Sequence, residues 1–131
     1  FADDRLEVGL NYAFTNARKR NSASPTDSTY DKYLIDVPAQ MLKGTISFHL
    51  ASLAVNLAGI FTGLQYTTED NAQSLPSYTV INANAVERLP FGRWVFEIKV
   101  EADNILDANY QVVQYYPMPG RTFRLSLGVV Y

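Results

Sequence analysis

The residues able to do chemistry in this chain are charged side chains that alternate with apolar ones. Glu97, Lys99, Glu101 and Asp103 occupy every second position of one segment, and Arg124 lies amid the polar positions of a later one. Side chains spaced by two lie in a row along one face of a β-strand. Four successive charges are more than a small soluble core can bury, so this face must be wet. We therefore predict a ladder of charges on adjacent strands, stabilised modestly by opposite signs.

His49 is the other candidate for acid–base or metal chemistry. The sequence has one histidine and no cysteine, so it offers no second imidazole and no thiolate. We expect His49 to be a polar residue on the wet face and predict that the protein binds no metal.

Acidic residues in two polar stretches are a further possible cation site. They are Asp27, Asp31 and Asp36 in the first stretch, and Glu69 and Asp70 in the second. We expect these carboxylates to be solvated loop charges. The sequence has no nucleophile–base pair, no glycine-rich phosphate loop and no metal-ligand spacing. We therefore predict that the protein is not an enzyme and uses no cofactor.

Six segments alternate between apolar and polar residues, as strands with one apolar face do. The clearest is the last, residues 121–131, whose apolar positions are Phe123, Leu125, Leu127, Val129 and Tyr131. The other five expected strands are residues 5–16, 41–50, 53–67, 78–88 and 94–103. A bulge near Gly59 would explain why Ile60, Leu64 and Tyr66 break the alternation of the third segment.

The connections between these segments alternate in length. Long polar connections cover residues 15–37, 68–77 and 105–120, and short turns cover 51–52 and 89–92. In an up-and-down antiparallel sheet, alternate connections lie at opposite ends, so one end carries the turns and the other the long loops. Bacterial outer-membrane barrels have this asymmetry. The sequence thus predicts an all-β, up-and-down antiparallel meander of about six long strands in a transmembrane β-barrel.

The pattern also meets the demands of a bilayer. Ten residues of about 3.3 Å each, tilted by about 40°, cover the apolar band of about 25 Å. The apolar faces of the first, fifth and sixth segments carry no charge through their middles. Aromatic residues near strand ends are expected to form interfacial girdles. They are Tyr12, Phe14, Tyr78, Phe91, Trp94, Phe123 and Tyr131.

Length and composition limit the remaining possibilities. The 131 residues make one domain or a piece of one, and a net charge of −2 gives no basic surface for nucleic acid. No run approaches the roughly 18 apolar residues of a transmembrane helix. The chain starts Phe-Ala-Asp-Asp, with neither an initiating methionine nor a signal peptide, so we expect a segment of a longer protein.

Two motifs resemble the C-terminal end of TonB-dependent outer-membrane receptors. Residues 103–110 read D-N-I-L-D-A-N-Y, and residues 116–125 read Y-P-M-P-G-R-T-F-R-L. Members of that family typically read N-L-F-D-K-x-Y, a variable loop, then Y-P-M-P-G-R-x-F and a last strand ending in an aromatic residue. Here Ile105 and Leu106 replace Leu-Phe, and Ala108 replaces Lys. The matching positions are Asn104, Asp107, Tyr110, Tyr116, Pro117, Pro119, Gly120 and Arg121.

The resemblance implies a barrel of about 22 strands, closed by an N-terminal plug, that imports scarce nutrients such as ferric siderophores or cobalamin. Residues 1–131 would supply the last six strands, without the plug or the energy-coupling box. The final strand, with Phe123, Leu125, Leu127, Val129 and Tyr131, would be the signal for the outer-membrane assembly machinery. The polar residues Glu97, Lys99, Glu101, Asp103 and Arg124 would face the lumen.

The resemblance also implies the partners and the location. The expected partners are outer-membrane lipid, the rest of the barrel, the plug domain and, through the plug, the TonB complex. The expected location is the bacterial outer membrane.

Two alternatives stay open from the sequence. One is a small soluble barrel that holds an apolar ligand inside, as lipocalins do, with the apolar faces turned inward. The other is an assembly in which copies of the chain share one barrel, because known membrane barrels begin at about eight strands.

Overall fold

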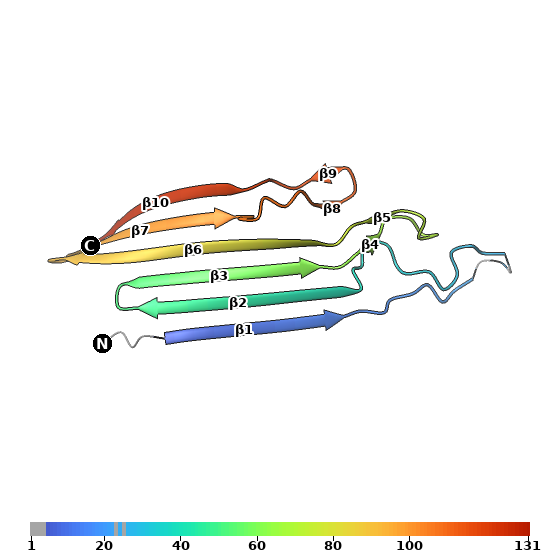
Figure 1. Cartoon of the computed structure of the whole chain (residues 1–131), viewed down its shortest axis with the longest axis horizontal. Helices are drawn as coiled ribbons and strands as arrows, with labels where there is room; N and C mark the ends of the chain where they lie inside the picture. The colour runs from blue at the N-terminus through green and yellow to red at the C-terminus, as the bar shows by residue number, and fades with distance from the viewer. Residues whose placement is uncertain (1–4, 23, 25) are drawn as a thin grey trace.

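The computed structural model describes residues 5–22, 24 and 26–131. Its main element is one antiparallel sheet of six strands in the order β1-β2-β3-β6-β7-β10 (Figure 1). The strands are β1 (Arg5–Phe14), β2 (Gln40–Leu50), β3 (Leu53–Thr62), β6 (Tyr78–Phe91), β7 (Trp94–Asp103) and β10 (Thr122–Val130). Each strand follows its neighbour in the chain, so the predicted up-and-down meander is confirmed.

The long connections and the short turns lie at opposite ends of the sheet (Figure 1). Two small hairpins lie within the long loops: β4 (Gln65–Tyr66) pairs with β5 (Ser74–Leu75), and β8 (Gln111–Val113) pairs with β9 (Tyr116–Pro117). None of the described residues belongs to a helix long and apolar enough to cross a membrane. The second hairpin lies within residues 105–120, where the sequence predicts no strand.

The sheet is a single layer without a hydrophobic core of the usual kind. Among the described residues, the buried side chains are confined to the long-loop end, where they are Thr62, Gln65, Leu75, Val80 and Asn104. Large apolar side chains along the strands remain open, with Leu10 77% exposed and Leu127 75% exposed. Backbone hydrogen bonds between strands therefore hold the sheet, because no layer of described residues packs over its apolar face.

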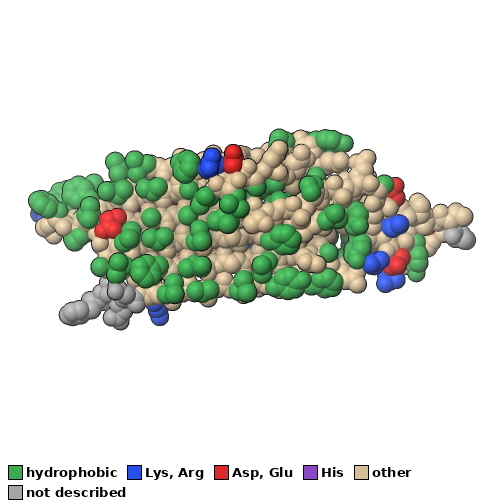
Figure 2. Space-filling model, viewed as in Figure 1, with side chains coloured by type: hydrophobic (Ala, Val, Ile, Leu, Met, Phe, Trp, Pro, Cys, Tyr) green, Lys and Arg blue, Asp and Glu red, His purple; other side chains and the backbone are tan. Residues whose placement is uncertain are grey.

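The register aligns apolar residues of all six strands on one side, which we call the apolar face. Leu6 pairs with Phe48, Ile46 with Leu57, and Ile98 with Leu127, so the alternation stays in phase across the sheet. The apolar face comprises Leu6, Val8, Leu10, Tyr12, Phe14, Leu42, Ile46, Phe48, Leu50, Leu53, Val55, Leu57, Phe61, Ile81, Ala83, Ala85, Leu89, Phe91, Trp94, Phe96, Ile98, Val100, Ala102, Phe123, Leu125, Leu127 and Val129. Figure 2 shows hydrophobic side chains spread over the sheet, with few charges among them.

The opposite side, which we call the polar face, carries most of the charged and amide side chains of the strands. It includes Arg5, Glu7, Asn11, Lys43, Ser47, His49, Asn56, Asn82, Asn84, Arg88, Glu97, Lys99, Glu101, Asp103, Thr122, Arg124 and Ser126. The predicted division between the faces of the first, second, fifth and sixth strands is confirmed.

The predicted bulge near Gly59 is wrong. β3 keeps an unbroken register with both β2 and β6 as far as Thr62, so Ile60 simply points to the polar face beside Lys43. Leu64 and Tyr66 broke the expected alternation because they lie beyond the end of the strand. The third strand therefore ends at Thr62 and not at Thr67.

The predicted turn at residues 89–92 is also misplaced. β6 continues through Leu89 and Pro90 to Phe91, which pairs with Trp94. The turn consists of Gly92 and Arg93, and Gly92 has a φ of 63°. Glycine suits this position because a left-handed backbone costs other L-residues roughly 1–2 kcal/mol.

We predict that Gly92→Ala weakens the β6–β7 hairpin by about 1 kcal/mol, because alanine must adopt the left-handed conformation. Hydrogen exchange of the β6 and β7 amides should show roughly fivefold lower protection. Gly59→Ala is the matched control, since a Cβ there meets no atom within 4 Å and Gly59 has no left-handed φ. Equal losses in both variants would contradict this explanation.

Candidate functional site

The five charged residues singled out in the sequence lie together on the polar face. Arg124 Nη2 is 2.8 Å from Asp103 Oδ2, and Arg124 Nε is 3.8 Å from Glu101 Oε2. Lys99 Nζ is 3.0 Å from Glu101 Oε1. The predicted charge ladder across β7 and β10 thus forms.

Arg88 extends this ladder and was missed in the sequence. Its Nε donates to Glu97 Oε2 at 3.0 Å, directly across the β6–β7 pair. In the fourth strand, Asn82 and Asn84 alternate with small apolar residues. Continuing this alternation to residue 88 would have placed Arg88 on the same face as the two asparagines. β6, β7 and β10 therefore carry three cations (Arg88, Lys99, Arg124) and three anions (Glu97, Glu101, Asp103) on this face, so the charges balance locally.

A hollow of about 380 Å³ lies at the loop end of this polar face. Asn82, Asp103 and Arg124 line it from three neighbouring strands, and Tyr110 and Gly120 line it from the loop between β7 and β10. Burial, together with a smaller effect of Tyr78, raises the pKa of the Tyr110 hydroxyl above its ordinary value. Tyr110 therefore stays a neutral hydrogen-bonding group at physiological pH.

The family-motif residues build the base of this loop. Asn104 is 3% exposed, and its Nδ2 donates to the carbonyl oxygens of Ala108 (2.9 Å) and Pro119 (3.2 Å). The Ala108 amide donates back to Asn104 Oδ1 at 2.9 Å. The Arg121 amide donates to Asp107 Oδ1 at 2.9 Å, which fixes the start of β10. Through these hydrogen bonds, the motif residues stabilise the loop between β7 and β10.

The other motif residues lie around the same loop. Tyr110 stacks on Tyr78 with ring centroids 4.5 Å apart, and Tyr116 and Pro117 form β9. A Cβ at Gly120 would lie 3.0 Å from Asp107 Oδ1, so a larger residue would crowd that contact.

The stacking also corrects the prediction that Tyr78 joins an interfacial girdle on the apolar face. Tyr78 pairs with Thr62 on the polar face, and its ring meets the loop. Its position near a strand end did not reveal which side it faces.

The three long loops are hydrogen-bonded to one another. The Tyr33 amide donates to Asn71 Oδ1 at 2.8 Å, and Asn71 Nδ2 donates to the Tyr33 carbonyl at 2.9 Å. Gln65 Nε2 donates to the Val112 carbonyl at 2.8 Å, which joins the second loop to the third. The loops therefore form one connected layer at the loop end of the sheet (Figure 1).

A hollow of about 370 Å³ opens where the first two loops meet the strands. Its lining includes Tyr33, Phe61 and Tyr66, and the rings of Tyr33 and Tyr66 stack with centroids 5.8 Å apart. Arg18 lies over the Tyr33 ring at 4.1 Å. This loop layer offers aromatic and hydrogen-bonding surface.

Several of the acidic loop residues are paired with cations. Asp27 lies 3.6 Å and Glu69 lies 3.9 Å from Lys19 Nζ, and Asp31 lies 2.8 Å from Arg20 Nη1. Hydrogen bonds from the Thr68 side chain and the Ala72 amide lower the pKa of Asp70. Among the described residues, no group of three or more His, Asp or Glu side chains is arranged to hold a metal ion.

His49 lies on the polar face at the turn end of β2, where it pairs with Arg5 and Ala54. Its side chain is exposed.

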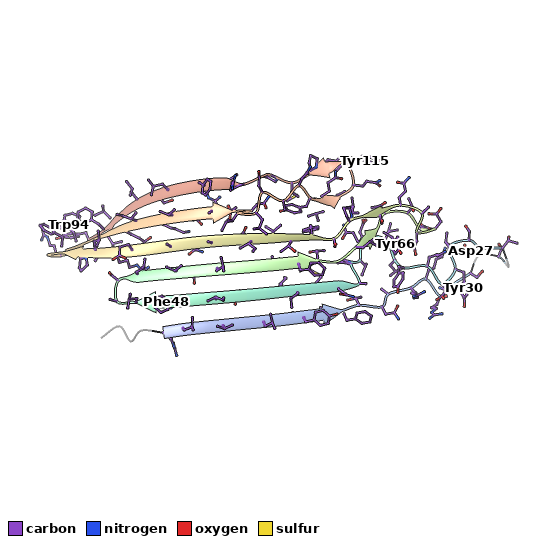
Figure 3. The ribbon with its side chains drawn as sticks, viewed as in Figure 1. Asp27, Tyr30, Phe48, Tyr66, Trp94 and Tyr115 are labelled. Atoms are coloured by element: carbon purple, nitrogen blue, oxygen red, sulfur yellow. The ribbon has the colours of Figure 1, made fainter. Side chains whose placement is uncertain are left out.

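Aromatic side chains of the apolar face lie near both ends of the strands. Phe14, Phe61 and Phe123 lie toward the loop end, and Phe48, Phe91 and Trp94 lie toward the turn end. The Tyr131 ring contacts Trp94, with centroids 4.7 Å apart. Figure 3 shows Phe48 and Trp94 toward the turn end, away from Tyr66 and Tyr115 in the loops.

These aromatic rows run obliquely to the strands. The register places Phe123 level with Val8 of β1, and Phe14 lies six residues farther along that strand. Six residues span about 20 Å and five strand spacings span about 24 Å, which corresponds to a strand tilt of about 40°. Strands of transmembrane barrels tilt by about 35–45°.

Two solved structures share this architecture. BauA, the ferric preacinetobactin receptor from Acinetobacter baumannii, superposes with a TM-score of 0.75 and 17% identity over 92% of this chain and 19% of that chain. The siderophore receptor PiuA from Acinetobacter baumannii gives a TM-score of 0.76 and 18% identity over 96% of this chain and 20% of that chain. The chain has the fold of a segment of a transmembrane β-barrel. It spans about a fifth of the length of each receptor.

No protein-family model and no curated protein matches the sequence. At 17–18% identity, the two receptors establish the fold of this chain.

We predict that Asn104→Ala loosens the loop between β7 and β10, because it leaves the Ala108 amide and two carbonyl groups without partners. The loss should be about 2 kcal/mol, or roughly thirtyfold lower hydrogen-exchange protection at Ala108.

Asn104→Gly separates the loss of the side-chain hydrogen bonds from backbone strain, because glycine accepts the φ of 50° at this position without strain. It should lose protection at Ala108 as well. Full protection in Asn104→Gly would mean that the side-chain hydrogen bonds are not responsible.

Proposed function

We propose that this chain forms part of the barrel wall of a TonB-dependent outer-membrane receptor that imports ferric siderophores. The observation that carries the proposal is the continuous apolar face, bordered by oblique aromatic rows and opposed by a polar face. Hydrocarbon cannot solvate charge, so a lipid-facing wall must be apolar. The sequence motifs at residues 103–110 and 116–125 and the likeness to two siderophore receptors support the same family.

In this proposal the polar face lines the lumen. Its compensated charges are compatible with a wet interior, where exposed ion pairs contribute roughly 0–1 kcal/mol each. Glu97, Lys99, Glu101, Asp103 and Arg124 then form lumen wall. The hollow beside Arg124 and Tyr110 lies where the lumen meets the outer loops.

The connected loop layer is the proposed outer surface. Long loops of outer-membrane barrels lie outside the cell, and the short turns lie in the periplasm. The aromatic hollow beside Tyr33 and Tyr66 is therefore accessible from the exterior. The plug, the TonB complex and the remaining strands are proposed partners.

The final strand is the proposed recognition element for assembly. Phe123, Leu125, Leu127 and Val129 stand exposed in one line on β10, and Tyr131 follows them. The outer edge of β10 has no partner strand among the described residues, so this strand is open to an incoming β-strand.

The soluble alternative receives no support from the arrangement of the strands. It requires the apolar side chains of β7 and β10 to line a closed interior. Leu125 is 67% exposed, and β1 and β10 do not pair with each other. The alternative in which copies share a barrel keeps the same apolar face, and cross-linking in membranes would detect it as a ladder of self-adducts.

We predict that Ile46→Arg blocks membrane insertion whereas Ser47→Arg does not. The two residues are adjacent in β2, but Ile46 lies on the apolar face and Ser47 lies beside Glu7 on the polar face. Arginine facing lipid near mid-bilayer costs about 2–4 kcal/mol, so insertion of Ile46→Arg should fall by roughly 30-fold or more. The measurement is protease protection of the full-length gene product in outer-membrane fractions.

Ser47→Arg controls for the added charge and size within the same strand. Equal insertion of the two variants, or a stronger defect in Ser47→Arg, would refute the lipid-facing assignment.

We predict that a strain from which the gene encoding this chain is deleted loses uptake of iron supplied as a ferric siderophore under iron limitation. Uptake of radiolabelled ferric siderophores should return when the full-length gene is restored. Labelled cobalamin is the comparison substrate, because the family resemblance also includes cobalamin receptors. Selective loss of cobalamin uptake would overturn the siderophore assignment and leave the receptor assignment in place.

A further inference from the structure

Glu87 is an exception on the apolar face. It pairs with Leu53 of β3 and with Ile98 of β7, so its side chain lies on the same side as these apolar residues. Among the described residues of the aligned rows that form this face, it is the one with a charged side chain. The small apolar residues that mark this face of the strand in the sequence end at Ala85, so the pattern does not reveal the side of Glu87.

The described part of the chain supplies Glu87 with a hydroxyl group but with no ion pair. The Ser52 hydroxyl donates to Glu87 Oε1. The adjacent cation, Arg88, points to the polar face and pairs with Glu97 at 3.0 Å. Arg93 at the neighbouring turn lies over the Tyr131 ring, at 4.6 Å. Glu87 is half-buried as a whole residue, and its hydrogen bond to Ser52 is exposed. The carboxylate can therefore accept further hydrogen bonds.

Glu87 lies toward the turn end of the apolar face, four residues before Phe91, the last residue of β6. Leu53 is the first residue of β3, and Ser52 belongs to the turn between β2 and β3. The Arg88 amide donates to the Ser52 carbonyl at 3.0 Å, which holds this turn against β6. Glu87 is therefore level with a short turn, at the end of the sheet that also carries Phe48, where a bilayer presents its head groups.

We propose that Glu87 is a binding site for the primary ammonium group of a phospholipid head group, such as that of phosphatidylethanolamine. This inference rests on the proposed membrane location. A carboxylate facing lipid needs a counter-charge that the described chain does not provide, and an ammonium group supplies both opposite charge and further N–H donors. Leu53 and Ile98 flank Glu87 and provide apolar surface for the acyl chains of the same lipid.

The test is to reconstitute the full-length gene product in vesicles of phosphatidylethanolamine and phosphatidylglycerol in equal amounts, and to measure the lipid retained on the purified protein. The wild-type protein should retain phosphatidylethanolamine preferentially. Glu87→Gln, which keeps the shape but removes the charge, should lower the retained ratio of phosphatidylethanolamine to phosphatidylglycerol by roughly threefold. An unchanged ratio in this variant would overturn the proposal.

Two further variants guard against a folding defect. Glu87→Leu suits a lipid-facing position, so it should insert at least as well as wild type and lose the same preference. Glu7→Gln, the same change on the polar face, should leave the preference intact. A Glu7→Gln effect equal to that of Glu87→Gln would overturn the proposal.

A third arm replaces phosphatidylethanolamine with phosphatidylcholine, whose quaternary ammonium has no N–H donor. Equal retention of the two lipids by wild type would overturn the proposed hydrogen-bonded site. Normal insertion with no lipid preference would refute this inference alone, whereas failure of the wild-type protein to enter membranes would refute the proposed function as well.

Discussion

Hydrogen bonds between neighbouring strands are the interaction on which this structure depends. Five antiparallel pairings join six strands, and no second layer of described residues covers the apolar face. A water-soluble sheet of this kind would bury its apolar side against a helix or another sheet. Here the alternation of side chains stays in phase across every pairing, so one face is predominantly apolar, with Glu87 as its one charged residue among those described. The medium against which that face lies therefore decides whether the sheet persists.

The architecture could be predicted from the sequence because alternation with period two is a strong local pattern. Residues 94–103 and 121–131 alternate cleanly, and the structure forms strands there. The errors occurred where local pattern alone was ambiguous. Ile60 is an apolar residue on the polar face, and this break in the alternation led to the prediction of a bulge. Pro90 led to the prediction of a turn, although it lies within β6 and pairs with Val95. Only pairing with neighbouring strands fixed the facing of these residues.

The polar residues were predictable as a row but not as a network. Alternation placed Glu97, Lys99 and Glu101 on one side, whereas the pairing of Arg88 with Glu97 depends on the β6–β7 register. Glu87 was missed for the same reason, because the side on which it lies follows from its pairing with Leu53 and Ile98. The contacts of Asn104 within its loop depend on backbone geometry that the motif itself does not reveal.

The mutual hydrogen bonding of the three long loops has a consequence for how such a protein can diversify. Asn71 of the second loop forms two hydrogen bonds with the backbone of Tyr33 in the first loop. Gln65 forms a hydrogen bond with the Val112 carbonyl in the third loop. Grafting one of these loops from a homologue would leave buried partners in its neighbours unsatisfied. The three loops are therefore exchanged more readily together than one at a time.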